Sequence, residues 1–306
     1  MNLKFIDLFA GIGGTRLAFE TNGLECVFSS EWDSHSQKTY AANFGETPHG
    51  DITKIAAANI PDFDVLVAGF PCQPFSSIGK REGFEHATQG TLFFDVLRII
   101  KDKRPSAFLL ENVKGLKNHD GGNTWLVIQQ SLSDLGYTIF AQVLDASDYG
   151  VPQKRERIYI VGFDKRRFKK PEFSFPKPVA KKVGIGKFVE SGVVDRSISR
   201  HLQSAYIFKK EDGRPEIVSP DSTHQVKTLV ASYHKIQRLT GTFVADGPTG
   251  LRLLTENECK AIMGFPKNFK VPVSRTQMYR QFGNSVAVPV VSKIAKSMMM
   301  VLEARR

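Results

Sequence analysis

The chain has 306 residues, 41% of them hydrophobic, which is enough for a full core in one large domain or two unequal ones and excludes a disordered chain. Its net charge of +11 favours a polyanionic partner. No basic and apolar leader opens the sequence, and no apolar run approaches about 18 residues, so we expect a cytoplasmic protein without a membrane segment.

Three cysteines, Cys26, Cys72 and Cys259, occur without a C-x-x-C pair. This number and spacing favour neither a disulfide framework nor a zinc site, and we expect no metal. In a reducing cytosol a single thiol can act as a nucleophile, although most lone buried cysteines are inert hydrophobes.

The first expected unit is a strand over residues 4–9, a glycine loop over residues 10–14 and a helix from residue 15 to residue 19. Glycines let the backbone approach a ligand closely, and the following helix offers free N–H groups at its positive end. The unit is therefore typical of a nucleotide-binding α/β domain.

Glu31 follows the second expected strand, residues 26–30, and lies 20 residues after Gly11, the usual distance for a carboxylate that binds ribose. Trp32 beside it can stack on an adenine. Arg16 stands where the dinucleotide fingerprint needs a glycine, which weakens an NAD interpretation. A tight turn without a ligand is the alternative interpretation of this loop taken alone.

Two further strand ends carry reactive side chains. Residues 62–68 predict a buried strand that leads toward Cys72, and residues 107–110 predict one that leads into Glu111. Because ligands bind at the carboxyl ends of the strands in open parallel sheets, we expect the thiol and the carboxyl group to share one edge. The polar, glycine-containing residues 76–90 that follow the cysteine are typical of a lid.

A cluster of cations, Lys154, Arg155 and Arg157, precedes the last expected strand of this domain. A solvated charged face is the alternative interpretation of the cluster alone. The other expected elements here are helices over residues 34–43 (with Ser34 as the N-cap), 91–100 and 124–135, and strands over residues 137–144 and 158–163.

The composition changes after this strand, because residues 164–187 hold nine Lys or Arg against two acids and read as a basic linker. Residues 188–250 are polar with turn signals, which predicts a small, mostly irregular or β domain. Thr255 and Glu258 form a capping-box pattern at the start of a helix, and an apolar helix over residues 286–302 can pack back on the first domain.

Five motifs occur together in the order and spacing of a known family: Phe9-Ala10-Gly11-Ile12-Gly13-Gly14, Pro71-Cys72-Gln73, Glu111-Asn112-Val113, Gln153-Lys154-Arg155-Glu156-Arg157 and Gln281-Phe282-Gly283-Asn284-Ser285. Over nearly its whole length the chain resembles the cytosine-C5 DNA methyltransferases of bacterial restriction-modification systems, in their short single-protein form. The resemblance implies a Rossmann-like S-adenosylmethionine-dependent methyltransferase sheet with helices on both faces over residues 1–180. A target-recognition domain, residues 181–255, and a hinge with a returning C-terminal helix, residues 256–306, complete the expected chain.

The resemblance implies a catalytic set of Cys72, Glu111, Asn112, Arg155 and Arg157. Cytosine C5 is a poor nucleophile, so the thiolate of Cys72 would first add to C6 of a base swung out of the duplex. Glu111 would contact N3 and the exocyclic amine, and Arg155 would hold O2. Arg157 lies close enough in sequence to meet DNA phosphate.

Further roles are carried over motif by motif. Contacts to S-adenosylmethionine are expected from Phe9, Gly11, Gly13, Glu31, Trp32, Asp51, Ile52, Pro71, Leu92, Asn284 and Ser285. Contacts to DNA are expected from Ser76, Ile78, Lys154, Thr228, Tyr233, His234, Lys235, Gln237 and Arg238, although a solvated loop is the alternative for any one of them.

The expected partners are double-stranded DNA and a functionally paired restriction endonuclease, and we expect a monomer. Two alternatives stay open from the residues: a tRNA cytosine-C5 methyltransferase, because a related group shares the Pro-Cys-Gln and Glu-Asn-Val motifs, and a catalytically silent nucleic-acid-binding protein on the same fold. The intact Cys72, Glu111 and Arg155 argue against the second alternative.

Overall fold

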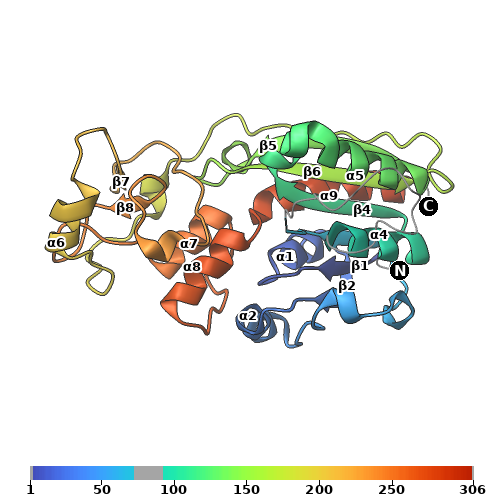
Figure 1. Ribbon diagram of the computed structural model, residues 1–306, viewed down its shortest axis with the longest axis horizontal. Coiled ribbons are helices and arrows are strands. Elements are labelled where there is room, and N and C mark those ends of the chain that lie inside the picture. The colour runs from blue at the N-terminus through green and yellow to red at the C-terminus, as the bar shows by residue number, and fades with distance from the viewer. Residues whose placement is uncertain (1–2, 72–91, 305–306) are drawn as a thin grey trace.

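The protein consists of a large body built on one sheet and a smaller body beside it, which Figure 1 shows at the right and the left. The structure is a computed structural model that describes residues 3–71 and 92–304. The principal elements are β1 (Lys4–Leu8), α1 (Gly14–Glu20), β2 (Glu25–Ser30), α2 (Ser34–Phe44), β3 (Val65–Ala68), α4 (Leu92–Lys103), β4 (Ala107–Val113), α5 (Asn123–Asp134), β5 (Tyr137–Asp145), β6 (Glu156–Asp164), α6 (Arg200–Leu202), β7 (Glu216–Val218), β8 (Thr242–Val244), α7 (Glu256–Met263), α8 (Arg275–Asn284) and α9 (Val288–Glu303).

The large sheet has six strands in the order β2-β1-β3-β4-β6-β5. β1 pairs in parallel with β2 and β3, and β3 pairs in parallel with β4, whereas β6 is antiparallel to both of its neighbours. β1 and β3 are central strands: β2 lies on the far side of β1, and β4 on the far side of β3. The direction in which the chain adds strands therefore reverses between β1 and β3, and open sheets bind ligands in the crevice at the carboxyl ends of two such strands.

Both faces of the sheet are covered, which explains why its strands are nearly continuous apolar runs. Alternate residues of β3 point to opposite faces: Val65 and Val67 join a core with α1 and α9, while Leu66 and Ala68 join a core with α4 and α5. The expected Rossmann-like sheet with helices on both faces is confirmed.

Helix starts show how far local signals predict this fold. The capping box at α7 is confirmed, because the Thr255 hydroxyl accepts from the Glu258 N–H and the Glu258 carboxylate accepts from the Thr255 N–H. The expected N-cap of α2 was wrong by one residue. The carboxylate of Asp33, and not Ser34, accepts from the free N–H groups of His35 and Ser36.

Residues 181–255, called the small domain below, contain only short elements: α6, the parallel pair β7 and β8, and single helical turns at Ile185–Phe188, Gln203–Ile207 and Tyr233–Lys235. This confirms the expected mostly irregular and β character. Its core, which includes Tyr233 and Phe243, continues into α7 and α8 through Met263 and Phe282. The domain limits at residues 180 and 255 stay predictions.

The C-terminal helices differ from the expectation in one respect, because α8 was not predicted. Its signals were the N-cap Ser274, which accepts from the Gln277 N–H, and the helical spacing of the buried Met278 and Phe282. By length and composition the segment Arg275–Glu303 could cross a membrane, but half of its most apolar window is buried inside the protein. α9 packs on α1 and is a core helix.

Candidate active site

The glycine loop after β1 is held by the carboxylate of Glu31. Glu31 Oε2 accepts from the Gly11 N–H at 2.8 Å, and Oε1 accepts from the Asp33 N–H at 2.8 Å. Only 8% of Glu31 is exposed, and this burial raises its pKa against the lowering effect of these hydrogen bonds. The Glu31 carboxylate therefore connects the segments that follow the two adjacent strands β1 and β2.

Two glycines of the loop have left-handed backbones for different reasons. Gly13 has φ 85° and precedes α1, and a Cβ there would lie 2.2 Å from the ring of Phe44. Gly11 has φ 55°, and a Cβ there would meet no atom within 4 Å. Close packing thus demands glycine at position 13, whereas at position 11 only the left-handed backbone favours it.

Alanine substitutions should separate these two roles. We expect Gly13→Ala to lower the free energy of unfolding by about 2–5 kcal/mol, from the left-handed backbone together with overpacking against Phe44. Gly11→Ala is the matched control and should cost only about 1–2 kcal/mol, for the backbone alone. Urea denaturation without added ligand measures both, and equal losses in the two variants would contradict this assignment.

A pocket of about 150 Å³ opens beside the loop. Its lining residues are Phe9, Ser30, Glu31, Trp32, Gly50, Asp51, Ile52, Thr53 and Leu92. Six of these were expected to contact S-adenosylmethionine. Trp32 is 75% exposed, so a large aromatic surface is available for stacking at this pocket.

The other expected cofactor residues lie outside that lining. Ser285 is next to the glycine loop, since a Cβ on Gly14 would lie 2.8 Å from its Oγ, while Asn284 and Pro71 are exposed. Sequence reasoning missed Ser30, Gly50 and Thr53, although Ser30 ends β2 and the other two flank the expected pair Asp51 and Ile52.

A carboxylate and a guanidinium group meet at the end of β4. The Nε of Arg157 lies 3.2 Å from Oε1 of Glu111, and both side chains are 16% exposed. β4 and β6 are antiparallel, and Val113 is opposite Arg157. Glu111 is two residues before Val113 on the same face of β4, so its side chain is a diagonal neighbour of Arg157. Burial raises the pKa of Glu111 despite the nearby cations, so this carboxyl group keeps its proton to higher pH than an ordinary glutamate.

Asn112 ties the end of β4 to the chain that follows β3. Its Nδ2 donates to the carbonyl of Phe70 at 2.9 Å, and its Oδ1 accepts from the Val113 N–H at 2.8 Å. The side chain is buried, and these bonds fix its orientation. Phe70 is two residues before Cys72, and Cys72 itself, like Ser76 and Ile78, lies outside the described residues.

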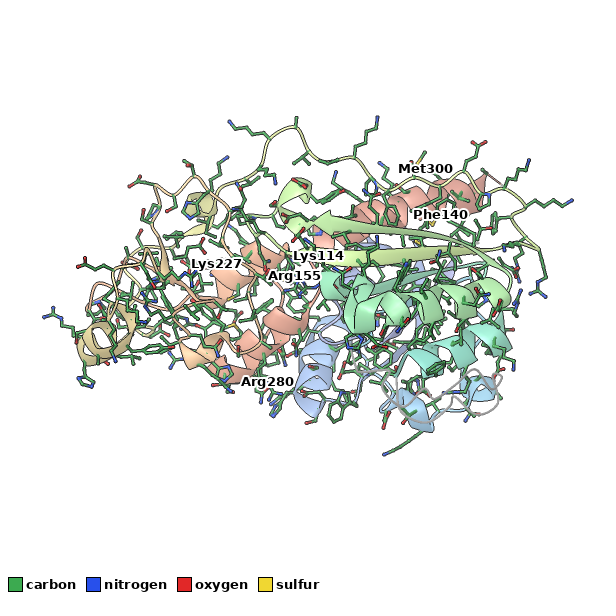
Figure 2. All side chains as sticks on the ribbon, turned by 45° about the horizontal axis from the view of Figure 1, so that its top comes forward. Lys114, Phe140, Arg155, Lys227, Arg280 and Met300 are labelled. Atoms are coloured by element: carbon green, nitrogen blue, oxygen red, sulfur yellow. The ribbon has the colours of Figure 1, made fainter. Side chains whose placement is uncertain are left out.

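Arg155 does not occupy the place expected for a residue that holds the base. It is 3% exposed, and its guanidinium group donates to the carbonyls of Leu229 at 3.1 Å, Gly283 at 3.1 Å and Ser285 at 2.6 Å. Burial, together with the charge of Arg157, lowers its pKa to about 10. Figure 2 shows Arg155 between the two bodies. Its two terminal nitrogens donate to main chain, which argues against the expected contact with O2.

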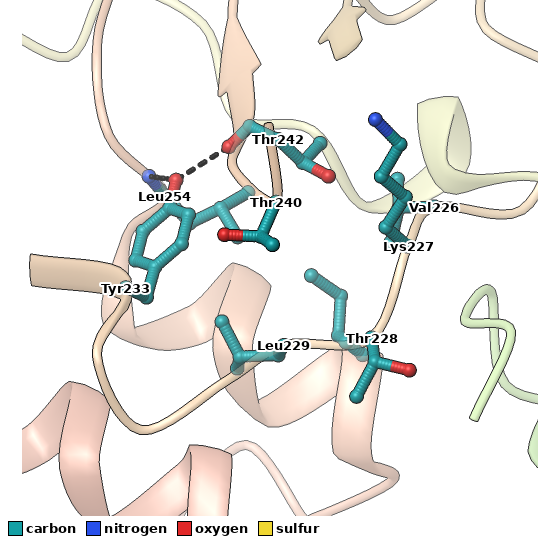
Figure 3. Close-up of a pocket in the computed structure, with 9 residues that line it drawn as sticks. Val226, Lys227, Thr228, Leu229, Tyr233, Thr240, Thr242 and Leu254 are labelled. Atoms are coloured by element: carbon teal, nitrogen blue, oxygen red, sulfur yellow. Dashed lines mark hydrogen bonds between the residues drawn. The ribbon is translucent and has the colours of Figure 1, made fainter. Parts of the chain in front are cut away.

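Two expected DNA contacts are also structural. Arg238 is 7% exposed and pairs with the carboxylate of Asp212, while its Nε donates to the carbonyl of Ile207 at 2.9 Å. The hydroxyl of Tyr233 donates to the Thr242 carbonyl and accepts from the Leu254 N–H, as Figure 3 shows beside a small cavity. These contacts form the core of the small domain and leave neither side chain free for DNA.

The other expected DNA contacts differ in exposure. Lys154, Lys235 and Gln237 are exposed, His234 is half-buried, and the Thr228 hydroxyl donates to the Lys154 carbonyl at 2.7 Å. Among the described residues, no group of three or more His, Cys, Asp or Glu side chains could hold a metal ion.

Comparisons with known proteins agree with this geometry. Residues 3–300 match the family described as C-5 cytosine-specific DNA methylase. The chain is 60% identical to Type II methyltransferase M.MspI of Moraxella sp over 99% of this chain and 72% of that protein. It is 61% identical to Type II methyltransferase M.BsuFI of Bacillus subtilis over 97% of this chain and 73% of that protein.

Solved structures show the same fold at lower identity. A mutant of Spodoptera frugiperda DNMT2 superposes with a TM-score of 0.79 at 24% identity, over 97% of this chain and 100% of that chain. Entamoeba histolytica methyltransferase EhMeth gives a TM-score of 0.80 at 22% identity, over 99% of both chains. The chain therefore belongs to the C-5 cytosine-specific DNA methylase family and is an S-adenosylmethionine-dependent DNA cytosine-C5 methyltransferase.

Proposed function

We propose that the enzyme methylates a cytosine swung out of a short specific sequence in double-stranded DNA, through a covalent bond between Cys72 and C6 of the base. The observation that carries this proposal is the pair of Glu111 and Arg157 at the end of β4. β3 lies beside β4, and its continuation leads directly to Pro71 and Cys72.

The thiol is needed because C5 of cytosine does not attack a methyl donor by itself. When the sulfur of Cys72 forms a bond to C6, the electron pair of the C5–C6 double bond is displaced and C5 gains enamine character. C5 can then take the methyl group; afterwards a base removes the C5 proton and the C6–sulfur bond breaks. Only a few per cent of an ordinary thiol is ionised near neutral pH, so the site has to favour the thiolate.

Glu111 and Arg157 are suited to the ring of the base. A carboxyl group with a raised pKa can share its proton with N3, so negative charge does not accumulate as the thiolate adds. Arg157 takes the role first expected of Arg155, since its side chain is partly exposed at Glu111 and can donate to O2. Asn112 holds the two strand ends together and acts as a positioning residue.

The pocket beside the glycine loop fits S-adenosylmethionine by its donor set. It combines the carboxylate of Glu31, suited to ribose hydroxyls, with the exposed ring of Trp32, suited to adenine. Bound there, S-adenosylmethionine supplies a methyl group activated on a sulfonium. Gly11 and Gly13 shape the loop beside this pocket, and Ser285 lies against Gly14 at the end of that loop.

In the cell, we propose that the enzyme acts in the cytoplasm as a monomer and protects host DNA beside a restriction endonuclease. The small domain would read the sequence, with Lys235 and Gln237 as exposed candidates for base or phosphate contacts and Lys154 for phosphate. Ser76 and Ile78, in the stretch that follows Cys72, remain candidates for contacts to DNA.

Methyl transfer can be tested directly. The enzyme is supplied with labelled S-adenosylmethionine and either duplex DNA or tRNA, and modified cytosines are mapped by bisulfite sequencing. We expect label in C5 of one cytosine within a short DNA sequence and none in tRNA. Label in tRNA alone would replace this substrate by the RNA alternative, and no transfer to DNA of any sequence would end the proposal.

A further inference from the structure

The main chain of Leu229, in the small domain, is held on both sides by side chains from the segment that enters β6. Oε1 of Gln153 accepts from the Leu229 N–H at 2.7 Å, and Nη1 of Arg155 donates to the Leu229 carbonyl at 3.1 Å. Gln153 is fully buried and Arg155 nearly so. Buried, directional bonds of this kind set the position of a peptide closely.

The main chains of the two segments also pair at this point. The Lys154 N–H donates to the Val226 carbonyl at 2.8 Å, and the Val226 N–H donates to the Pro152 carbonyl at 2.9 Å. The Thr228 hydroxyl adds a bond to the Lys154 carbonyl at 2.7 Å. Residues 226–229 are thus joined to residues 152–155 by a continuous ladder across the two bodies.

The same two side chains reach the C-terminal helices. Nη2 of Arg155 donates to the carbonyls of Gly283 and Ser285, and Nε2 of Gln153 donates to the Ile262 carbonyl at 3.0 Å. Ser285 lies against Gly14 of the glycine loop. Arg155 therefore connects the small domain with the end of α8 and, through Ser285, with the glycine loop.

Arg157 follows Arg155 by two residues and pairs with Glu111. We infer that Arg155 and Gln153 are positioning residues that couple the small domain to the Arg157 and Glu111 pair, so that correct seating of a DNA sequence aligns the base site. The inference rests on the proposed roles of Glu111 and Arg157.

The free-energy cost of burying the charged side chain of Arg155 favours a role in coupling over a role in packing alone. A buried charge contributes little net stability, and Nε of Arg155 is buried with no hydrogen-bond partner among residues 3–71 and 92–304. Apolar residues of similar volume could join the same elements with less desolvation. The hydrogen bonds from Arg155 to the carbonyls of Leu229, Gly283 and Ser285 are directional. They therefore specify one relative position of the segment that enters β6, the Leu229 segment and the end of α8.

The test compares Arg155→Lys and Gln153→Glu with wild type on the recognised duplex and on duplexes with one base pair changed. Lysine keeps the charge but cannot reach three carbonyls in one plane; glutamate keeps the acceptor for Leu229 and loses the donor to Ile262. We expect kcat on the recognised duplex, and the kcat/KM ratio between the two duplexes, each to fall about tenfold or more. The Kd for S-adenosylmethionine should change less than about twofold, which is much smaller than the tenfold effect expected on kcat and on discrimination.

Arg166→Lys is the matched control, since this exposed arginine pairs only with Asp164 among the described residues and should leave every value unchanged. Because Arg155 and Gln153 hold the same peptide, the double variant should lose much less discrimination than the product of the single losses. Two results would overturn the inferred coupling. One is a lower Tm in the single variants with unchanged discrimination between the two duplexes, and the other is a loss of discrimination in the double variant that equals the product of the single losses. If wild type transfers no methyl group to DNA, the proposed function fails instead.

Discussion

We expect Cys72→Ser to lose methyl transfer and to keep DNA binding. We expect the rate of transfer in a single turnover to fall by more than about a thousandfold, because a serine hydroxyl has almost no ionised fraction near neutral pH and adds poorly to C6. The exchange of sulfur for oxygen is small, so affinity for the recognised duplex should change little. Labelled S-adenosylmethionine measures the first quantity and a band-shift titration the second.

The other two cysteines provide matched controls. Burial raises the pKa of Cys26 to about 12 and that of the fully buried Cys259 well above its ordinary value, so both thiols remain protonated. Cys26→Ser should therefore keep nearly the wild-type rate. A duplex with 5-fluorocytosine at the target should trap the wild type covalently and leave Cys72→Ser free. A fully active Cys72→Ser enzyme would contradict the proposed adduct.

Glu111→Gln should lower kcat by about 10²–10⁴-fold, the usual contribution of a positioned acid or base. The pH profile carries a second test. Because burial raises the pKa of Glu111, its proton is present at low pH and is lost as pH rises, so this group should give the wild type a falling alkaline limb in kcat. Glutamine does not titrate, and that limb should be missing from the profile of the variant.

Glu156→Gln is the control for this substitution. Glu156 precedes Arg157 and pairs with Lys114 at 2.9 Å on the surface, so its removal should change neither kcat nor the alkaline limb. Arg157→Lys should lower kcat as well, because an ammonium group cannot reproduce the planar fork of guanidinium. An unchanged alkaline limb in Glu111→Gln would assign that titration to another group.

Local chemistry made several features predictable. Apolar runs followed by a carboxylate predict the strands β2, which ends just before Glu31, and β4, whose last residues include Glu111, and the rule for open sheets predicts both carboxylates at one edge. The capping box of Thr255 and Glu258 involves residues only three apart, so the sequence contains the whole interaction. The shift of the α2 cap from Ser34 to Asp33 shows the limit, because neighbouring polar residues offer equivalent acceptors.

The sequence by itself determined the sheet, the glycine loop with its carboxylate, and the motifs that assign the chain to its family, because these depend on short-range patterns. Only the tertiary structure distinguishes the surroundings of Arg155 from those of Arg157. Two cations two residues apart look alike in sequence, yet Leu229, Gly283 and Ser285 surround one of them and Glu111 receives the other. The same holds for Arg238 and Tyr233, whose partners come from other segments of the small domain. Burial of a polar side chain depends on such distant partners, and no local pattern specifies them.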